Sequence, residues 1–220
     1  MLRWFLWLAA LRTAGGTILV DGGGFQCPLV GGLVAQVVDS LPDVELVGAS
    51  CGAWMQTYQC AHNRTAFRSA VVGGFQGWKR APPADWLSGL RTLLTPLDFD
   101  GACLRRLKVL VLGADGGTLL TDFVDAADYF DAASVSSHWP SFFGPSTYRG
   151  RAYVDGALVP VDALRRRFDH LVVARHNPFL GLPRLLDDDD PGEWARGRTV
   201  GRAVVALQET GARFSTVPVF

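Results

Sequence analysis

Short apolar runs, each about the length of one strand, alternate with helix-like stretches along most of this 220-residue chain. The runs are Thr17 to Val20, Val44 to Val47, Lys108 to Leu112 and Leu171 to Ala174. Runs of this kind are typical of strands buried on both faces of a parallel sheet, and the helices between them supply the crossovers. The sequence therefore predicts an α/β fold, a single domain with a mostly parallel central sheet flanked by helices.

Helices are expected between these strands and after the last one. One begins near Pro28, because Leu29, Leu33, Val37 and Leu41 recur every four residues and form one apolar face. Other helices are predicted over residues 53–62, 122–133 and 192–211. Residues 64–103 show no clean period and receive no assignment, and residues 192–220 are interpreted as a C-terminal helix and tail.

Charge and cysteine content narrow the functional classes. The 21 Lys and Arg residues equal the 21 Asp and Glu residues in number, so no polybasic surface is indicated and nucleic acid is not an expected partner. The cysteines, Cys27, Cys51, Cys60 and Cys103, form no CxxC pair and no zinc-ligand spacing with histidine. For a chain of this size we expect free thiols in a reducing compartment; disulfides are the alternative, since spacing alone does not determine pairing.

Residues 1–16 form a hydrophobic N-terminal segment. The apolar run from Trp4 to Leu11 is too short to span a membrane, which takes about 20 residues. Three interpretations are open: a short helix packed on the domain, a Trp-rich foot on a lipid surface, and a signal peptide, which Arg12 disfavours. The expected location is cytoplasmic, with peripheral membrane contact and secretion as alternatives.

The segment from Gly48 to Gly52 fits the pattern G-x-S-x-G and lies between a predicted strand and a predicted helix. Glycines on both sides of Ser50 permit the sharp turn that exposes a serine hydroxyl. A helix N-terminus at this point favours a developing negative charge. The pattern predicts that Ser50 is a nucleophile on a strand-to-helix elbow.

Two other motifs follow predicted strands. Gly22, Gly23 and Gly24 follow Asp21, and their backbone N–H groups could stabilise an oxyanion or hold a phosphate, although no P-loop lysine follows. Asp155, the other candidate, begins an Asp-Gly pair, which by itself indicates a hairpin turn. Beside an exposed serine it becomes a candidate general base, and burial next to that serine is expected to raise its pKa.

Together these motifs resemble those of the patatin-like phospholipase family. That family carries D-G-G-G-x-[RK]-G, then G-x-S-x-G, then D-G-[GA], matched here at residues 21–27, 48–52 and 155–157. Its A-S-x-A-x-P-x-x-F-x-P stretch is similar to a segment that begins at Ala133-Ser134 and ends at Pro140 to Pro145. The resemblance covers roughly Thr17 to Val173. Gln26 and Cys27 depart from it, because the family has a basic residue and a glycine there.

The resemblance implies a lipid acyl hydrolase of the phospholipase A or lysophospholipase type. Ser50 and Asp155 would form the catalytic dyad, and the amides of the three loop glycines would form the oxyanion hole. Gly48 and Gly52 would shape the elbow, and Gly156 and Ala157 would complete the aspartate motif. A lipid acyl ester is then the expected partner, and neither a metal nor another cofactor is needed.

Two alternatives are retained. The first is an α/β-hydrolase with the triad Ser50, Asp155 and His176, whose chain order is correct, although the glycine loop lies too close to Ser50 in sequence for that fold. The second is a catalytically impaired lipid-binding or scaffold protein, which the departures at Gln26 and Cys27 motivate. The sequence indicates neither the lipid head group nor the oligomeric state.

Overall fold

The computed structural model describes residues 16–22, 24–82, 85–141, 143–168, 171–176, 190–210 and 214–219. Its strands form an open sheet in the order β5-β6-β3-β2-β1-β7-β8, with β4 also paired to β3. They are β1 (Thr17–Val20), β2 (Glu45–Gly48), β3 (Lys108–Gly113), β4 (Gly116–Leu120), β5 (Ser146–Tyr148), β6 (Arg151–Asp155), β7 (Leu171–His176) and β8 (Phe214–Val219). The pairs β1–β2, β1–β7, β2–β3 and β7–β8 are parallel, whereas β4 and β6 run antiparallel to β3. The predicted mixture of α and β around a largely parallel sheet is confirmed.

The helices connect these strands. They are α2 (Cys27–Ser40), α3 (Cys51–Met55), α4 (Arg64–Lys79), α5 (Trp86–Leu94), α6 (Gly101–Leu104), α7 (Ala126–Val135), α8 (Val161–Arg165) and α9 (Asp190–Glu209). In the described part of the chain, the short 3-10 helices η1 (Gly24–Gln26), η2 (Gln56–Cys60) and η4 (Gly156–Leu158) lie among them. Pro28 stands in the first turn of α2, where its missing N–H leaves no hydrogen bond unmade.

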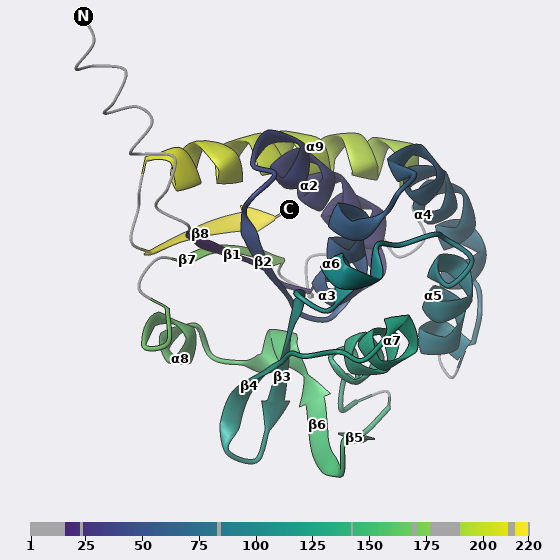
Figure 1. Cartoon of the computed structure of the whole chain (residues 1–220), viewed down its shortest axis with the longest axis vertical. Helices are drawn as coiled ribbons and strands as arrows, with labels where there is room; N and C mark the ends of the chain where they lie inside the picture. Colours follow the sequence, from purple (N-terminus) through teal and green to yellow (C-terminus); the bar gives the residue numbers. More distant parts are fainter. Residues whose placement is uncertain are drawn as a thin grey trace, which may run out of the picture.

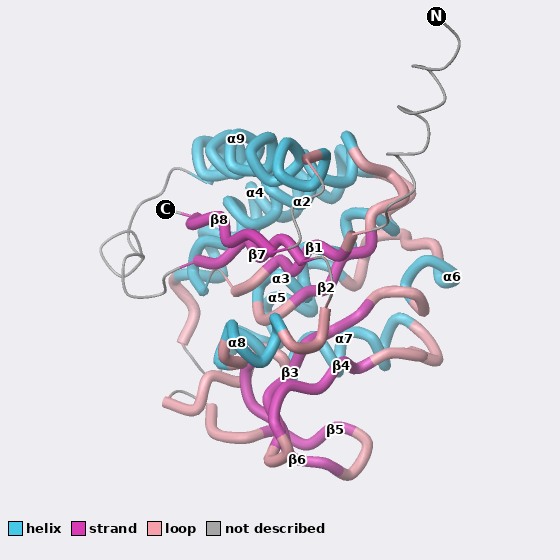
Figure 2. Tube along the Cα trace, turned by 90° about the vertical axis from the view of Figure 1, so that its left-hand side faces the viewer, coloured by secondary structure: helices cyan, strands magenta, loops and turns pink. Residues whose placement is uncertain are grey.

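The sheet buries side chains on both faces. Along β1, Ile18 and Val20 join the main core with α2 and α3, while Leu19 points the other way and packs with Val159 and Leu164. This alternation follows from the two-residue period of a strand. Figures 1 and 2 show the two layers: α2 and α9 cover one side of β1, β7 and β8, and α8 lies on the other.

Helices α2 and α9 approach closely because glycines line their contact. A Cβ atom at Gly31 would lie 2.7 Å from the Trp194 ring, and one at Gly32 would collide with the Trp194 carbonyl. Trp194 is itself buried. The close contact holds the N-terminal end of α2, which follows the glycine loop, against a long helix.

Several elements differ from the sequence prediction. Residues 64–103, for which the sequence predicts no element, contain α4, α5 and α6, and α4 begins at a cap in which Asn63 accepts a hydrogen bond from the Ala66 N–H. The predicted helix over 53–62 begins earlier and continues as η2 after α3. The expected C-terminal tail is wrong in part, because Phe214–Val219 adds β8 beside β7.

The expectation of free thiols is wrong. Cys27 pairs with Cys51, and Cys60 pairs with Cys103, so no free cysteine remains. The Cα atoms are 5.6 Å and 5.4 Å apart, within the range that a disulfide bridges. The partners are 24 and 43 positions apart in sequence, and only tertiary packing brings them together.

Residues 1–15 lie outside the described part of the chain, so the interpretations of Trp4 to Leu11 stay untested. Gly16, which follows them, is buried. Within the described ranges no helix has the length and apolar character needed to cross a bilayer.

Candidate functional site

Ser50 lies on a sharp turn between β2 and α3. The strand ends at Gly48 and the helix begins at Cys51, which leaves two residues to reverse the chain direction. Ser50 takes φ 53° and ψ −126°, a conformation that a residue with a side chain rarely adopts. A Cβ atom at Gly52 would collide with the Val20 carbonyl, and one at Gly48 would lie 2.6 Å from the Ala53 Cα. Both glycines are therefore required by close backbone approach.

A buried serine that sequence reasoning missed holds this turn. The Ser50 N–H donates to Ser136 Oγ at 2.9 Å, and Ser136 Oγ donates to the Leu110 carbonyl at 2.6 Å. Ser136 is fully buried. The sequence comparison aligns the segment at Ala133-Ser134, whereas the spacing A-S-x-A-x-P counted back from Pro140 places the serine at 136.

Asp155 ends β6 and lies within hydrogen-bonding reach of Ser50. Its position is set by the pairing of β6 with β3, in which Asp155 stands opposite Val111. Its N–H donates to the His138 carbonyl at 3.0 Å, and the next N–H, of Gly156, donates to the Ser136 carbonyl at 3.2 Å. The segment after α7 therefore positions both Ser50 and Asp155.

The Asp155 carboxyl group is buried and carries an altered pKa. Burial, with a smaller contribution from the neighbouring Asp21, raises the pKa of Asp155 from 3.8 to about 7. Hydrogen bonds from the Ala157 N–H, at 2.8 Å, and from the Ser50 hydroxyl act in the opposite direction. The expected rise is thus present, and it adjusts the group to proton transfer near neutral pH.

The glycine loop packs directly on the serine. A Cβ atom at Gly22 would lie 2.9 Å from the Ser50 Cβ and 3.2 Å from its Oγ. The Gly22 N–H donates to Asp21 Oδ1 at 2.8 Å, so this amide already has an acceptor. Gly24 has φ +50°, which favours glycine, and Gly23 lies outside the described residues. The oxyanion role of these amides stays a prediction.

The Asp-Gly pair at 155 and 156 does not form a hairpin turn. The chain passes from β6 into η4, and Asp155 Oδ1 caps that short helix through the Ala157 N–H. A Cβ atom at Gly156 would collide with the Leu110 carbonyl and lie 3.1 Å from Ser136 Oγ. Glycine at 156 lets the aspartate strand approach β3 closely.

The histidines have different positions. His176 ends β7, where its backbone pairs with Val219, and its side chain lies outside what the structure describes. His138 is half-buried, its ring centroid is 5.6 Å from that of Phe143, and burial lowers its pKa. Its backbone carbonyl, rather than its ring, is the group that contacts Asp155.

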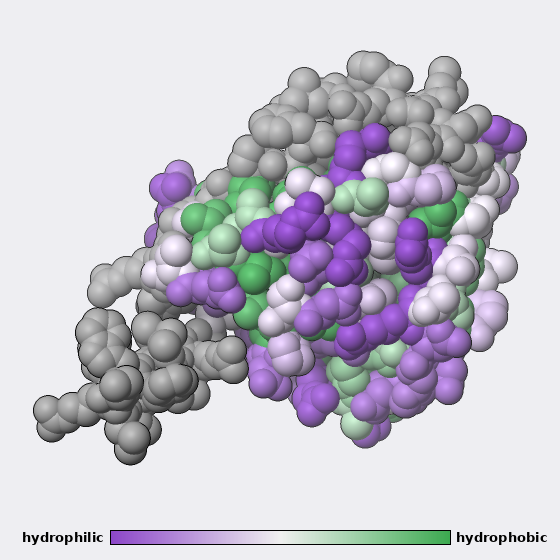
Figure 3. Space-filling view, turned by 90° about the horizontal axis from the view of Figure 1, so that it is seen from above, coloured by the Kyte–Doolittle hydropathy of each residue, from purple (hydrophilic) through white to green (hydrophobic). Residues whose placement is uncertain are grey.

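Other possible sites lie apart from these residues. Within the described ranges no group of three or more His, Cys, Asp or Glu side chains could hold a metal ion. A hollow of about 250 Å³ is lined by Tyr58, Arg64, Thr65, Arg68, Trp194 and Arg198. Two of its arginines, Arg64 and Arg198, pair with Asp39. Figure 3 looks down on the face that carries α9, where polar residues predominate between smaller apolar patches.

Comparison with known proteins adds no assignment: no protein-family model matches the chain, and no curated protein matches it either.

Proposed function

We propose that this chain is a serine-dependent hydrolase of lipid acyl esters, of the phospholipase A or lysophospholipase type, with a patatin-like fold. The observation that carries the proposal is the geometry that places Ser50 beside the aspartate motif. Ser136 accepts the Ser50 N–H through Oγ at 2.9 Å and the Gly156 N–H through its carbonyl at 3.2 Å, and a Cβ atom at Gly22 would lie 3.2 Å from both Ser50 Oγ and Ala157 Cβ. Burial raises the pKa of the Asp155 carboxyl group to about 7. A strained serine next to a base of suitable pKa is the arrangement that activates a nucleophile.

The proposed reaction proceeds in two steps. Asp155 accepts the Ser50 proton while Ser50 Oγ attacks the ester carbonyl, and it returns that proton to the oxygen of the departing alcohol, which leaves an acyl-enzyme. Asp155 then accepts a proton from a water molecule that attacks the acyl-enzyme, and it returns this proton to Ser50 Oγ as the fatty acid leaves. N–H groups of the glycine loop, together with that of Cys51, the residue after the nucleophile, would hold the oxyanion. These steps need no metal and no cofactor.

The direct contact between Ser50 and Asp155 favours a dyad over a triad. In a triad the imidazole ring lies between the serine and the carboxylate and receives the serine proton. Here the Ser50 hydroxyl lies near enough to lower the pKa of the Asp155 carboxyl group by hydrogen bonding. His176 is therefore not needed for proton transfer in the proposed mechanism.

An apolar route near the site supports a lipid substrate. Ring centroids follow one another at 4.3 Å from Phe75 to Trp78, 5.8 Å to Trp86, 6.3 Å to Phe143 and 5.6 Å to His138. His138 in turn accepts the Asp155 N–H through its carbonyl. Four of these rings, all but Phe75, are partly exposed, so an acyl chain could lie along them.

A specific observation favours the second candidate function, a catalytically impaired lipid-binding protein. Gln26 stands where the family has a basic residue, and its side chain is buried with Oε1 making no hydrogen bond to the described residues. If a cation is essential at that position, the fold would bind lipid without turning it over.

The two disulfides support an oxidising compartment as the place of action. Structural disulfides persist in secreted and other oxidising environments and are rare in the cytosol. We therefore propose this location in place of the cytoplasm. Alkylation of the protein as isolated from its source, followed by intact mass measurement, would show no modified cysteine; four modified cysteines would contradict the proposal.

Labelling with a fluorophosphonate, followed by peptide mapping, tests the hydrolase. We expect the label on Ser50, and we expect Ser50→Ala to abolish both labelling and hydrolysis of a p-nitrophenyl acyl ester. Ser69→Ala, a change of an exposed serine on α4, is the matched control and should leave both unchanged. A folded wild-type protein that binds lipid vesicles but shows neither labelling nor hydrolysis would support the impaired protein instead.

A further inference from the structure

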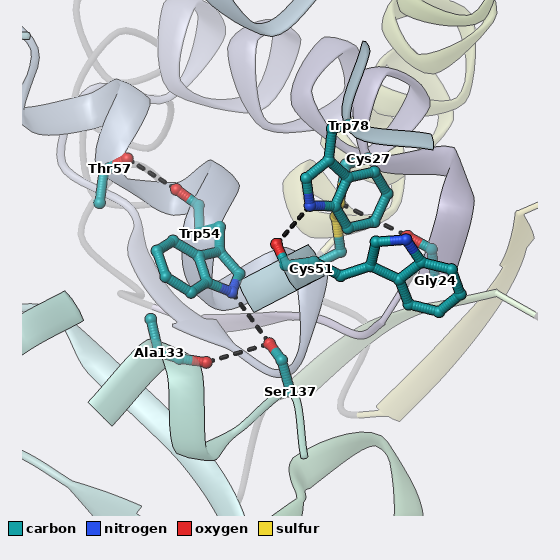
Figure 4. The surroundings of a disulfide bond; sticks show 9 residues. Gly24, Cys27, Cys51, Trp54, Thr57, Trp78, Ala133 and Ser137 are labelled. Atoms are coloured by element: carbon teal, nitrogen blue, oxygen red, sulfur yellow. Dashed lines mark hydrogen bonds between the residues drawn. A yellow bond between two sulfur atoms is a disulfide. The ribbon is translucent and has the colours of Figure 1, made fainter. Parts of the chain in front are cut away.

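The Cys27–Cys51 disulfide connects the glycine loop to the strand-to-helix turn at Ser50. Cys51 directly follows Ser50 and begins α3, whereas Cys27 begins α2 immediately after the glycine loop and η1. Figure 4 shows the disulfide with Gly24, whose carbonyl oxygen lies 3.5 Å from Cys27 Sγ. The bridge therefore links the end of the loop to the residue beside the nucleophile.

At Cys51 the disulfide is attached to α3, a helix whose position is fixed by buried contacts. Trp54, one turn after Cys51, is fully buried, and its Nε1 donates to Ser137 Oγ at 2.9 Å. Ser137 Oγ donates in turn to the Ala133 carbonyl at 3.0 Å, so α3 is anchored to α7 (Figure 4). A link to Cys51 thus ties the loop to a part of the core that cannot easily shift.

On the loop side, small displacements matter. Gly22 packs on Ser50 with no room for a methyl group, and Gly24 is exposed with no neighbour within 4 Å of where its Cβ would lie. Oxyanion donors act only within about 3 Å of the developing charge, and a misplacement of about 1 Å can cost a factor of about 100 in rate. The glycine loop is packed against Ser50 at Gly22 but has no neighbour at Gly24, so a constraint at its C-terminal end would fix the position of its N–H groups.

We propose that the Cys27–Cys51 disulfide is a positioning element of the hydrolytic site, which holds the glycine loop in register with Ser50 and makes turnover depend on the oxidation state of this pair. The inference rests on the proposed function, because it concerns the same loop and the same nucleophile. Reduction by a dithiol transfers two electrons and two protons to the bridge; this gives two thiols, and the dithiol closes to its own cyclic disulfide. The loop then stays attached to α2 but loses its link to the elbow.

The second disulfide supplies a matched control. Cys60 and Cys103 connect η2 to α6, and neither cysteine is adjacent in sequence to a candidate site residue. We compare Cys27→Ala/Cys51→Ala with Cys60→Ala/Cys103→Ala, using hydrolysis of p-nitrophenyl butyrate. The first double variant should lose about 10- to 100-fold in kcat with KM changed less than about threefold, whereas the second should keep kcat within about twofold of wild type. Urea unfolding of both variants, which should lose similar stability, separates positioning from general destabilisation.

Reversible reduction provides the second readout. In the Cys60→Ala/Cys103→Ala background the remaining disulfide is Cys27–Cys51, so dithiothreitol should lower kcat to the level of the Cys27→Ala/Cys51→Ala variant, and reoxidation should restore it. Fluorophosphonate should still modify Ser50 in the reduced protein, only more slowly. If the oxidised protein hydrolyses the ester and neither reduction nor the Cys27→Ala/Cys51→Ala change lowers kcat, the positioning role is wrong and the hydrolase stands. If the oxidised wild-type protein neither hydrolyses the ester nor labels at Ser50, the proposed function itself fails.

Discussion

The dependence of ester hydrolysis on pH tests the role of Asp155 most directly. Its pKa is raised to about 7, and a general base acts only in its ionised form. The ionised fraction then rises from about 10% near pH 6 to about 90% near pH 8. We expect kcat/KM for a soluble ester to rise about tenfold across this window, with a midpoint near 7 that reports the free enzyme.

A single substitution should move that midpoint in a known direction. Asp21 raises the pKa of Asp155 by charge repulsion, and its Oδ1 accepts the Gly22 N–H. Asp21→Asn removes the charge but keeps an oxygen that can accept the same hydrogen bond. The midpoint should therefore shift to lower pH with little loss of the maximal rate, whereas His176→Ala should leave the midpoint in place.

The raised pKa also predicts an opposite change in stability. Because the folded-state pKa of Asp155 lies above its unfolded value, the stability that this group contributes is fully present below about pH 3.8 and is lost as the pH rises through about 7. The rise of the Asp155 pKa from 3.8 to about 7 corresponds to a loss on the order of 4 kcal/mol. Asp155→Asn should thus hydrolyse the ester far more slowly than wild type yet be at least as stable near pH 8, as measured by urea unfolding. A wild-type rate independent of pH between about 5.5 and 8.5, or an unmoved midpoint in Asp21→Asn, would refute the assignment.

Three further outcomes are expected. Asp155→Asn should lower kcat by about 10²- to 10⁴-fold, while His176→Ala stays within a few-fold of wild type; equal losses would restore the triad. Ser136→Ala removes the acceptor of the Ser50 N–H and the donor to the Leu110 carbonyl, so it should lower the free energy of unfolding in urea by about 1–3 kcal/mol. It should also lower kcat more than it raises KM, and an unchanged kcat would show that the turn at Ser50 does not need this serine. A disulfide stabilises the fold by restricting the unfolded chain, and the effect grows with the length of the loop that it closes. Loss of Cys60–Cys103, which spans 43 positions, should therefore cost about 4 kcal/mol, and loss of Cys27–Cys51, which spans 24, about 3.5 kcal/mol. A higher calorimetric unfolding midpoint for the variant without Cys60–Cys103 would contradict this order.

Local patterns were sufficient to predict the framework of the site. The run from Thr17 to Val20 became β1, and the helix predicted from Pro28 became α2, because apolar period and a proline at the helix start act over a few residues. The elbow at Ser50 was visible for the same reason, since a strand, two flanking glycines and a helix lie within one short segment. The stretch from Arg64 to Lys79 gave no clear period, yet packing against neighbouring helices made it α4.

Contacts between segments far apart in the chain could not be predicted from the same sequence. The segment Phe214–Val219 contains Pro218, which argues against a central strand, but β8 is at the edge of the sheet, where proline is tolerated. Ser136 looked like one serine among several, and its role depends on Leu110 and Ser50, which are 26 and 86 positions away. The pairing of cysteines likewise depends on how α2 and α3 are placed.

By itself, the sequence determined the elements β1, α2, β2 and β3, the strand-to-helix turn at Ser50 and the glycine loop after β1, because each depends on backbone preferences within about ten residues. Only the tertiary structure places Asp155 next to Ser50, buries the Asp155 carboxyl group so that its pKa rises, and brings Cys27 within bonding distance of Cys51. These features arise when β6 pairs with β3 and α2 packs beside α3. Burial and distance are properties of such packing, and they exist only once distant segments have come together.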